Sequence, residues 1–411
     1  MEETPSPYPL TRREFLHRSA GGLGLLAFSG FVPAFITQAA AARVPQPDKD
    51  RTILVLIQLA GGNDGLNTVI PVYNDQYYKL RPRLAIKRQD AIQLDSKHYL
   101  NPNMGAVAEL WKEGKLSIVN NVGYPNPNRS HFRSTEIWET AVDSDRSTHT
   151  GWIGRYLDSE CEGKPRATDP QVVHVGDELP QSVLSTKPHN IFGLPNRGRV
   201  HKQYGQDLLQ DVLASEMGEG NAGYLQNTLM DAMVTEQRVA DILAKYKPMA
   251  EYGGTNLGRS LQRVAALIAS GMETRVYFVK QTGYDTHSGQ NYRHGLLLKE
   301  LSDAMGAFQA DMEKHRLQDQ VLTMTFSEFG RRPNENNSSG TDHGTAAPLF
   351  VMGTGVKDSI VGQPPNLNVE HNQDLSFSTD FRQVYATVIQ NWFQADTGAV
   401  IDKPMRPLGF V

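Results

Sequence analysis

The sequence predicts an α/β fold in which a mostly parallel sheet is sandwiched by helices. Three apolar runs, residues 54–59, 276–279 and 321–326, lack the alternation of a half-buried strand, which is typical of parallel strands covered on both faces. Each run ends in a cluster of acids, glycines and histidines. Because open α/β sheets bind ligands at the carboxyl ends of their strands, we expect the three clusters to meet at one edge.

The first half of the chain shows one strand, helix, strand unit. A strand at about 52–59 is followed by a glycine-rich turn, and apolar residues at helical spacing predict a helix over 103–113. Residues 116–119 read as the next strand. The turn-rich segment 123–132 then opens a helix that runs through Trp138.

The second half repeats this pattern, which favours right-handed parallel crossovers. Two helices, 257–270 and 292–315, each lead into a strand, at 275–280 and 321–326. Further expected elements are a strand at 172–175, helices at 206–217 and 223–247, an apolar stretch at 348–352, and a closing helix from Thr379-Asp380 through Trp392.

The N-terminus predicts a twin-arginine export signal over residues 1–42. Arg12-Arg13 precede an uncharged, weakly apolar segment at 20–36 and four alanines at 39–42, the layout of a signal that carries folded proteins across a bacterial cytoplasmic membrane. An uncleaved membrane anchor is the alternative, but its glycines and Pro33 would make a poor spanning helix.

We therefore expect a polar linker at 43–51 and one α/β domain over 52–411, with a partly helical insertion or cap at about 158–255. The expected location is periplasmic or otherwise exported from a bacterium, with the twin-arginine export machinery as a partner. No other stretch is long and apolar enough to span a membrane, so the mature protein is expected to have no stable membrane span.

Composition excludes several classes of function. The charge is −4, from 41 basic and 45 acidic residues, and there is no basic stripe, so nucleic acid is not an expected partner. The turn at 61–65 lacks the spacing of a dinucleotide fingerprint. The single cysteine, Cys161, cannot form a disulfide within the chain, and its acidic neighbours disfavour a reactive thiolate.

Carboxylates and imidazoles after the predicted strands indicate a metal site. Asp285 and His287 follow one strand, and Asp342 and His343 lie beyond a loop. Acids and neutral imidazoles suit Zn²⁺, Mn²⁺ or Fe²⁺ better than Mg²⁺ or Ca²⁺, and two such ligand groups leave positions open for substrate oxygens.

Two other acids add to this site. Asp64 and Glu328 could hold a second ion or orient the ligands of the first, and Asp64 could equally be a turn former. The expected cofactor is therefore one or two divalent ions.

Ser130 is the candidate nucleophile. It precedes a predicted helix whose N–H groups would face an anion near its hydroxyl, although a plain helix cap is the alternative. His131 is the second catalytic candidate, and Asn63 and Arg331 are the candidates for substrate binding. Arg331 could clamp an anionic oxygen or form a structural ion pair with Glu328. A nucleophilic oxygen, a metal and helix amides together favour phosphoryl or sulfuryl transfer.

These motifs resemble the alkaline phosphatase superfamily, which includes cofactor-independent phosphoglycerate mutases, phosphopentomutases and sulfatases. The segments Ser327-Glu328-Phe329-Gly330 and His343-Gly344, the latter running into 348–353, resemble its last two metal segments. His287-Ser288-Gly289 resembles the middle histidine segment, and Asp64 the first acidic ligand. The resemblance implies an alkaline phosphatase-like fold.

Most of the mature chain also looks like one exported bacterial family that is labelled a domain of unknown function and is distantly allied to those phosphatases and sulfatases. The segments that carry this likeness are the twin-arginine signal, 61–65, 130–132, 150–152, 285–287 and 327–331.

The resemblance implies one ion held by Asp285, His287 and His343. It implies a second ion held by Asp64, Ser130 and an Asp-His pair that falls on Glu328 and Phe329. Phenylalanine cannot bind a metal, so either His131 fills the gap, or the site holds one ion, or catalysis has been lost.

The expected function is an exported metal-dependent hydrolase of phosphate or sulfate esters, with a small-molecule or glycan ester as substrate. The alternative is a non-catalytic exported binding or assembly protein on the same fold with a degenerate metal site.

Overall fold

The computed structural model describes residues 51–160, 169–196, 232, 235–357, 359–370 and 372–411. The chain divides into two compact units, residues 1–44 with 197–245 and residues 45–196 with 246–411. In the first unit, residues 235–245 are helical. The predicted signal, residues 43–50 of the predicted linker, Cys161 and the predicted helix at 206–217 lie outside the described residues.

A mostly parallel sheet forms the centre of the second unit, which confirms the predicted fold class. Among the described residues it has nine strands, in the order β13-β5-β12-β9-β1-β8-β6-β7, with β14 paired to β5. All pairings are parallel except those of β12 with β5 and β9. The bounds are β1 Ile53–Ala60, β5 Leu116–Gly123, β6 Val172–Val175, β7 Ile191–Leu194, β8 Val276–Thr282, β9 Val321–Phe326, β12 Ala347–Met352, β13 Ile360–Val361 and β14 Thr379–Asp380.

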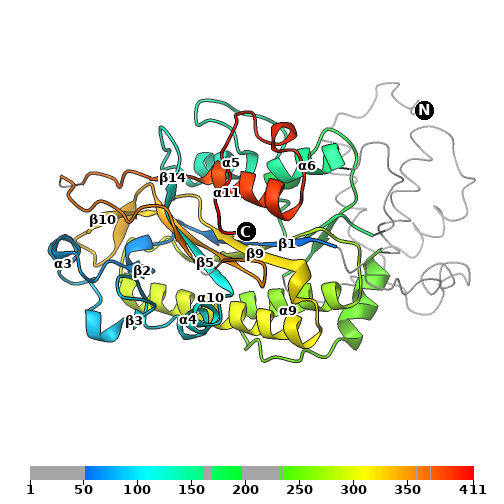
Figure 1. The fold of residues 1–411 in the computed structure, drawn as a ribbon, viewed down its shortest axis with the longest axis horizontal. Helices are drawn as coiled ribbons and strands as arrows, with labels where there is room; N and C mark the ends of the chain where they lie inside the picture. Colours follow the sequence, from blue (N-terminus) through cyan, green and yellow to red (C-terminus); the bar gives the residue numbers. More distant parts are fainter. Residues whose placement is uncertain (1–50, 161–168, 197–231, 233–234, 358, 371) are drawn as a thin grey trace, which may run out of the picture. The chain divides into compact units, whose positions relative to one another are not determined.

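Helices cover both faces of the sheet (Figure 1). One layer holds α4 (Gly105–Lys112), α9 (Asn256–Ala269) and α10 (Gln290–Lys314). The other holds α5 (His131–Thr140), α6 (Trp152–Glu160) and α11 (Phe381–Thr387), which continues as a π-helix over Val388–Trp392. This arrangement agrees with the apolar strands, because β1 and β5 can bury nearly all of their side chains only if both faces are covered.

Smaller elements flank the sheet. The short helix α3 (Asp75–Leu80) stands beside a three-stranded sheet of β2 (Val69–Ile70), β4 (Tyr99–Leu100) and β3 (Ile92–Gln93). A two-stranded ribbon joins β10 (Arg331–Glu335) to β11 (Thr341–His343). Among the described residues, no helix has both the length and the apolar character needed to cross a membrane.

Most of the expected elements are present, but two details differ from a simple sequence interpretation. The apolar run at 348–352 belongs to β12, which is antiparallel to both of its neighbours. In the stretch expected to be an insertion or cap, β6 and β7 extend the main sheet beyond β8. The closing helix begins as expected, because Asp380 and Gln383 form a reciprocal capping box at its first turn.

The carboxyl ends of β1, β5, β8 and β9 lie at one edge of the sheet. Gln58 near the end of β1 is level with Lys280 of β8 and Phe326 of β9. The antiparallel strand β12 begins at this edge, where the parallel strands end. The loops that follow four strands and the loop that precedes β12 therefore meet there, as the sequence predicts.

Candidate metal centre

Glycines let the loop after β1 approach its neighbours. Gly61 and Gly62 have φ of +122° and +83°, a region that side chains disfavour. A Cβ on Gly61 would lie 2.3 Å from the backbone nitrogen of Asp285, and a Cβ on Gly62 would lie 2.4 Å from the ring of Phe329. Only glycine at both positions permits the loop after β1 to pack against the loops after β8 and β9.

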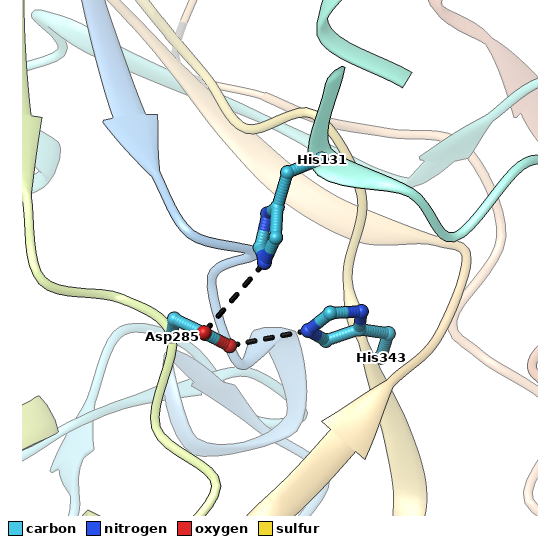
Figure 2. A group of neighbouring side chains, drawn as sticks. All are labelled: His131, Asp285 and His343. Carbon is cyan, nitrogen blue, oxygen red and sulfur yellow. Dashed lines mark hydrogen bonds and ion pairs between the residues drawn. The ribbon is translucent and has the colours of Figure 1, made fainter. Parts of the chain in front are cut away.

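Four side chains converge at this edge (Figure 2 shows three of them). Ligand atoms of His131, Asp285 and His343 all lie within 4.8 Å of one another. The His343 Nε2 atom is 3.1 Å from Asp285 Oδ1, and the His131 Nε2 atom is 3.7 Å from Asp285 Oδ2. His287 joins them, with its Nε2 atom 2.9 Å from His343 Nε2 and 3.1 Å from Asp285 Oδ1.

The other nitrogen of each imidazole faces an acceptor, which fixes the neutral tautomer. His343 Nδ1 lies 2.9 Å from the carbonyl oxygen of Arg129, which can only accept, so this nitrogen donates. His131 Nδ1 lies 2.8 Å from Glu328 Oε1, and His287 Nδ1 lies 3.2 Å from Asp342 Oδ1. In their neutral forms all three rings therefore turn an unprotonated Nε2 toward Asp285.

The lone pairs of these Nε2 atoms face one another and the Asp285 carboxylate. They repel one another and the carboxylate unless a cation lies among them. Imidazoles that donate Nδ1–H to a carboxylate or carbonyl while presenting Nε2 are typical of protein metal ligands. With bonds of 2.0–2.1 Å, ligand atoms around a tetrahedral zinc ion are roughly 3.3 Å apart. The separations of 2.9 to 3.7 Å to Asp285 and between His287 and His343 are close to that spacing. His131, Asp285 and His343, whose ligand atoms all lie within 4.8 Å of one another, could therefore hold one transition-metal ion, with His287 beside them.

The electrostatics of the cluster keep Asp285 ionised. Burial opposes its charge, but the hydrogen bond from Arg331 and the neighbouring imidazoles outweigh it and lower the pKa of Asp285 to about 2. The hydrogen bond to Glu328 is the main cause that raises the pKa of His131. Burial is the main cause that lowers the pKa of His343, which favours the neutral ring that a metal requires.

Glu328 and Asp342 support the imidazoles and do not face Asp285. Glu328 Oε1 accepts from His131 and also from the backbone N–H of Gly61 at 2.8 Å. Asp342 Oδ1 accepts from His287 and from the Asn336 amide at 3.0 Å. The Asn336 hydrogen bond is the main cause that lowers the pKa of Asp342.

The structure does not bring Asp64 into this cluster. Its carboxylate and the Arg81 guanidinium are both fully buried and form a bidentate pair at 2.6 and 2.9 Å. The Gln290 amide donates to the same carboxylate. Burial opposes its charge, yet the charge and hydrogen bonds of Arg81 prevail and lower the pKa of Asp64. These contacts make Asp64 a structural partner of Arg81.

Arg331 and Asn63, the two residues expected to bind substrate, both form hydrogen bonds with other residues of the fold. The buried guanidinium of Arg331 donates to the carbonyl oxygens of four residues and to Asp285 Oδ1 at 2.6 Å, the four being Gly61, Gly62, Tyr284 and Thr341. It therefore holds the loops together and positions Asp285. Asn63 is fully buried, and its Oδ1 accepts from His294 and Thr68.

Ser130 is exposed and caps α5 by position, but its side chain makes no capping hydrogen bond. Its neighbours on both sides belong to the centre, because the Arg129 carbonyl accepts from His343 and His131 faces Asp285. Ser134, also in α5, differs from Ser130 because its hydroxyl group is buried. It is hydrogen-bonded to Tyr124 and to the carbonyl oxygen of Glu328.

A cleft of about 830 Å³ adjoins the centre, with His131, Asp285 and Glu328 on its wall. Its other lining residues include Phe132 and Glu139 of α5 and His174 of β6. None of these three is among the site residues that the sequence predicts. Helical spacing offered one signal, because Glu139 follows His131 by two turns and therefore lies on the same helix face.

A family model described as "Protein of unknown function (DUF1501)" matches residues 91–405. No curated protein matches the sequence.

Among solved structures, a protein in the alkaline phosphatase superfamily from Vibrio parahaemolyticus is 10% identical, with a TM-score of 0.36 over 81% of this chain and 71% of that one. The PsFucS1 sulfatase from Pseudoalteromonas sp. is 11% identical, with a TM-score of 0.38 over 90% and 71%. Ps i-CgsB in complex with k-i-k-neocarrahexaose is 9% identical, with a TM-score of 0.40 over 84% and 72%.

Proposed function

Because the chain belongs to the DUF1501 family of proteins of unknown function, we propose its function from its own site: a metal-dependent hydrolase of phosphate or sulfate esters. The observation that carries this proposal is the convergence of three unprotonated Nε2 atoms on the Asp285 carboxylate. The chain binds one divalent ion there, with Zn²⁺, Mn²⁺ or Fe²⁺ favoured over Mg²⁺ or Ca²⁺ by the imidazole ligands.

The ligands in this proposal are His131, Asp285, His287 and His343. A second ion at Asp64 is not part of the proposal, because Arg81 neutralises that carboxylate. Glu328 and Asp342 keep the imidazoles in the correct tautomer and orientation. In this proposal His131 is a metal ligand.

A divalent ion bound to these ligands supplies a Lewis acid that polarises an ester oxygen. Ser130 provides the attacking hydroxyl, because its side chain is exposed, makes no capping bond and stands between two residues of the centre. The first-turn N–H groups of α5 favour the negative charge of a phosphate or sulfate group beside it.

One observation favours a non-catalytic binding protein as the second candidate. The phosphate and sulfate esters of the first candidate are anionic, whereas the guanidinium of Arg331 is buried and already donates to five acceptors within the fold. In this second candidate the metal centre would be structural or would bind a ligand without turning it over.

The twin-arginine pattern at Arg12-Arg13 supports export of the folded chain from a bacterial cytoplasm to the periplasm or beyond. Export of a folded protein is compatible with a centre whose ligands come from distant parts of the chain.

Metal analysis and ester assays test the proposal. We expect about one transition-metal ion per wild-type chain, near-complete loss in His343→Ala and Asp285→Ala, and retention in Ser130→Ala. Hydrolysis of aryl phosphate or aryl sulfate should be lost in all three. His98→Ala is the matched control, because His98 pairs with Asp95 outside the centre.

The two candidates give different results. A wild-type chain that binds no transition metal contradicts the metal centre itself. A chain that binds the ion stoichiometrically but hydrolyses neither ester supports the non-catalytic candidate.

A further inference from the structure

The cleft beside the metal centre extends along helix α5. Phe132, Thr135, Glu136 and Glu139 of this helix line it together with His131. His131 and Glu139 share a helix face and are about 12 Å apart along the axis, at 1.5 Å per residue. A ligand whose reacting end lies at the metal can therefore reach Glu139 with its other end.

At the inner end of this cleft, two mostly buried residues present polar side chains to its wall. Gln58 and His174 are only 2% and 5% exposed, line the cleft, and make no side-chain hydrogen bond or ion pair within the described residues. Because no other residue in the described part of the chain bonds to their side chains, the polar atoms of Gln58 and His174 are available to a ligand in the cleft.

Two charged groups complete the inner end. The Glu139 side chain is 6% exposed, and it has no basic partner within hydrogen-bond reach in the described part of the chain, although its Oε2 accepts from the backbone of Ser182. Burial raises the pKa of Glu139 to about 7, so near neutral pH its carboxyl group both donates and accepts. Lys280 lines the same cleft. Donors and acceptors are thus mixed, which suits hydroxyl groups.

The chemistry of the walls selects against a polyanion. Seven acidic residues line the cleft and Lys280 is the single lysine or arginine among its lining residues, as far as the structure describes them. At the metal end, Phe132 is 91% exposed and lines the same cleft. An exposed aromatic ring can stack on the apolar face of a saturated or aromatic ring of a ligand.

We propose that the cleft binds an uncharged sugar, with Phe132 stacked on its ring near the metal and with Gln58, Glu139, His174 and Lys280 bonded to its hydroxyl groups at the inner end. This inference rests on the proposed function of the same site, because it assigns the sugar as the part of the ester substrate that does not react. A saccharide that carries several sulfate or carboxylate groups is excluded by the acidic walls.

Binding of the full chain to an array of neutral, sulfated and amine-bearing oligosaccharides tests this proposal. We expect binding to neutral members of the array. Phe132→Ala and Glu139→Gln should each raise the dissociation constant at least about tenfold, as expected for the loss of a stacking ring or of a buried, ionisable carboxyl group that accepts from the sugar hydroxyl groups.

Matched controls separate the cleft from the rest of the surface. Tyr292→Ala removes a ring that is 75% exposed outside the cleft, and Glu109→Gln removes an exposed carboxylate on α4. Both should bind as wild type does. Binding only to sulfated members, only to amine-bearing members or to none of the array overturns the proposal, as does neutral binding that Phe132→Ala and Glu139→Gln leave unchanged.

The same array distinguishes this inference from the proposed function. His343→Ala should lose the metal and the hydrolysis of aryl esters but keep binding to neutral sugars, because the inner end lies about 12 Å along α5 from the metal ligands. Sugar binding without metal or turnover would contradict the proposed function alone, and metal with turnover but without sugar binding would contradict the inference alone.

Discussion

The carboxylate of Glu328 is placed to set the affinity of the centre without touching the ion. Its Oε1 atom accepts from His131 Nδ1 and from the N–H of Gly61, so it fixes both the ring and the loop after β1. Without it, His131 can rotate or adopt the other tautomer, which turns a protonated nitrogen toward the metal.

We expect Glu328→Ala to weaken metal binding by about 10- to 100-fold, the usual effect of losing a carboxylate behind a metal-bound imidazole. Competition with a chromophoric chelator measures the affinity. Glu109→Ala is the control, since that carboxylate is exposed on α4. An unchanged affinity in Glu328→Ala would remove His131 from the ligand set.

Asp64 should govern stability in acid and leave metal binding unaffected. Its pKa lies below the ordinary value of 3.8 because, although burial opposes the charge, Arg81 outweighs burial. A carboxyl group with a lowered folded-state pKa contributes stability above its unfolded-state pKa, and this contribution is lost as the pH falls through the folded-state value.

We therefore expect Asp64→Asn to lower the free energy of unfolding at pH 7 by about 3–5 kcal/mol, because Arg81 loses its buried counter-ion. The loss relative to wild type should shrink below about pH 4. Denaturant unfolding at several pH values measures both effects. Retention of the metal in the folded variant is part of the expectation, and its loss would make Asp64 a ligand.

For individual residues, the sequence predicts some roles in the site and leaves others open. Asp285, His287 and His343 follow or precede apolar strands, so their convergence follows from the topology of a parallel sheet. Asp64 and Asn63 are bonded to Arg81 and His294, which belong to other elements of the fold, and no local pattern encodes these partners. Nothing local distinguishes a carboxylate that faces an ion from one that faces a guanidinium.

Helix α5 connects the chemistry of the metal to that of the cleft. It begins with His131, a proposed metal ligand, and carries Glu139 two turns later on the same face. Burial is the largest cause that raises the pKa of Glu139 to about 7, and the charge of Glu328 adds to it, whereas Lys280 and two backbone N–H groups oppose it.

This raised pKa predicts that folding stability falls as pH rises from about 4.5 to about 7, because the folded chain binds more protons than the unfolded chain in that range. Glu139→Gln should remove this part of the pH dependence. Thermal unfolding from pH 4 to pH 8 measures it, and Glu136→Gln, whose carboxylate pairs with Arg133, is the control. Parallel profiles for wild type and Glu139→Gln would contradict the assignment.

The sequence predicts strands well where both of their faces are fully buried. The runs at 54–59 and 321–326 match β1 and β9 closely, because strands covered on both faces require unbroken apolar residues. The direction of β12 was not predictable in this way. A buried parallel strand and a buried antiparallel strand can have the same apolar sequence pattern. The direction of β12 is set by the ribbon of β10 and β11, which turns the chain around before β12.

For the whole molecule, the proposed export depends on the arginine pair near the N-terminus. Replacing Arg12-Arg13 by two lysines keeps the charge but removes the recognised pair. We expect the variant to stay in the cytoplasm, as measured by fractionation and immunoblotting of the bacterial host. Equal amounts of the variant and wild type in the periplasm would contradict a twin-arginine route.

The proposed ligands of the centre come from the start of α5, the loop after β8 and the end of β11, so no short stretch of the nascent polypeptide can supply all of them to an ion in advance. The pocket for the ion exists only once the central sheet has assembled. Consequently the ion that is captured is the one abundant in whichever compartment folding finishes, and a chain refolded in the presence of a different ion should carry that ion instead.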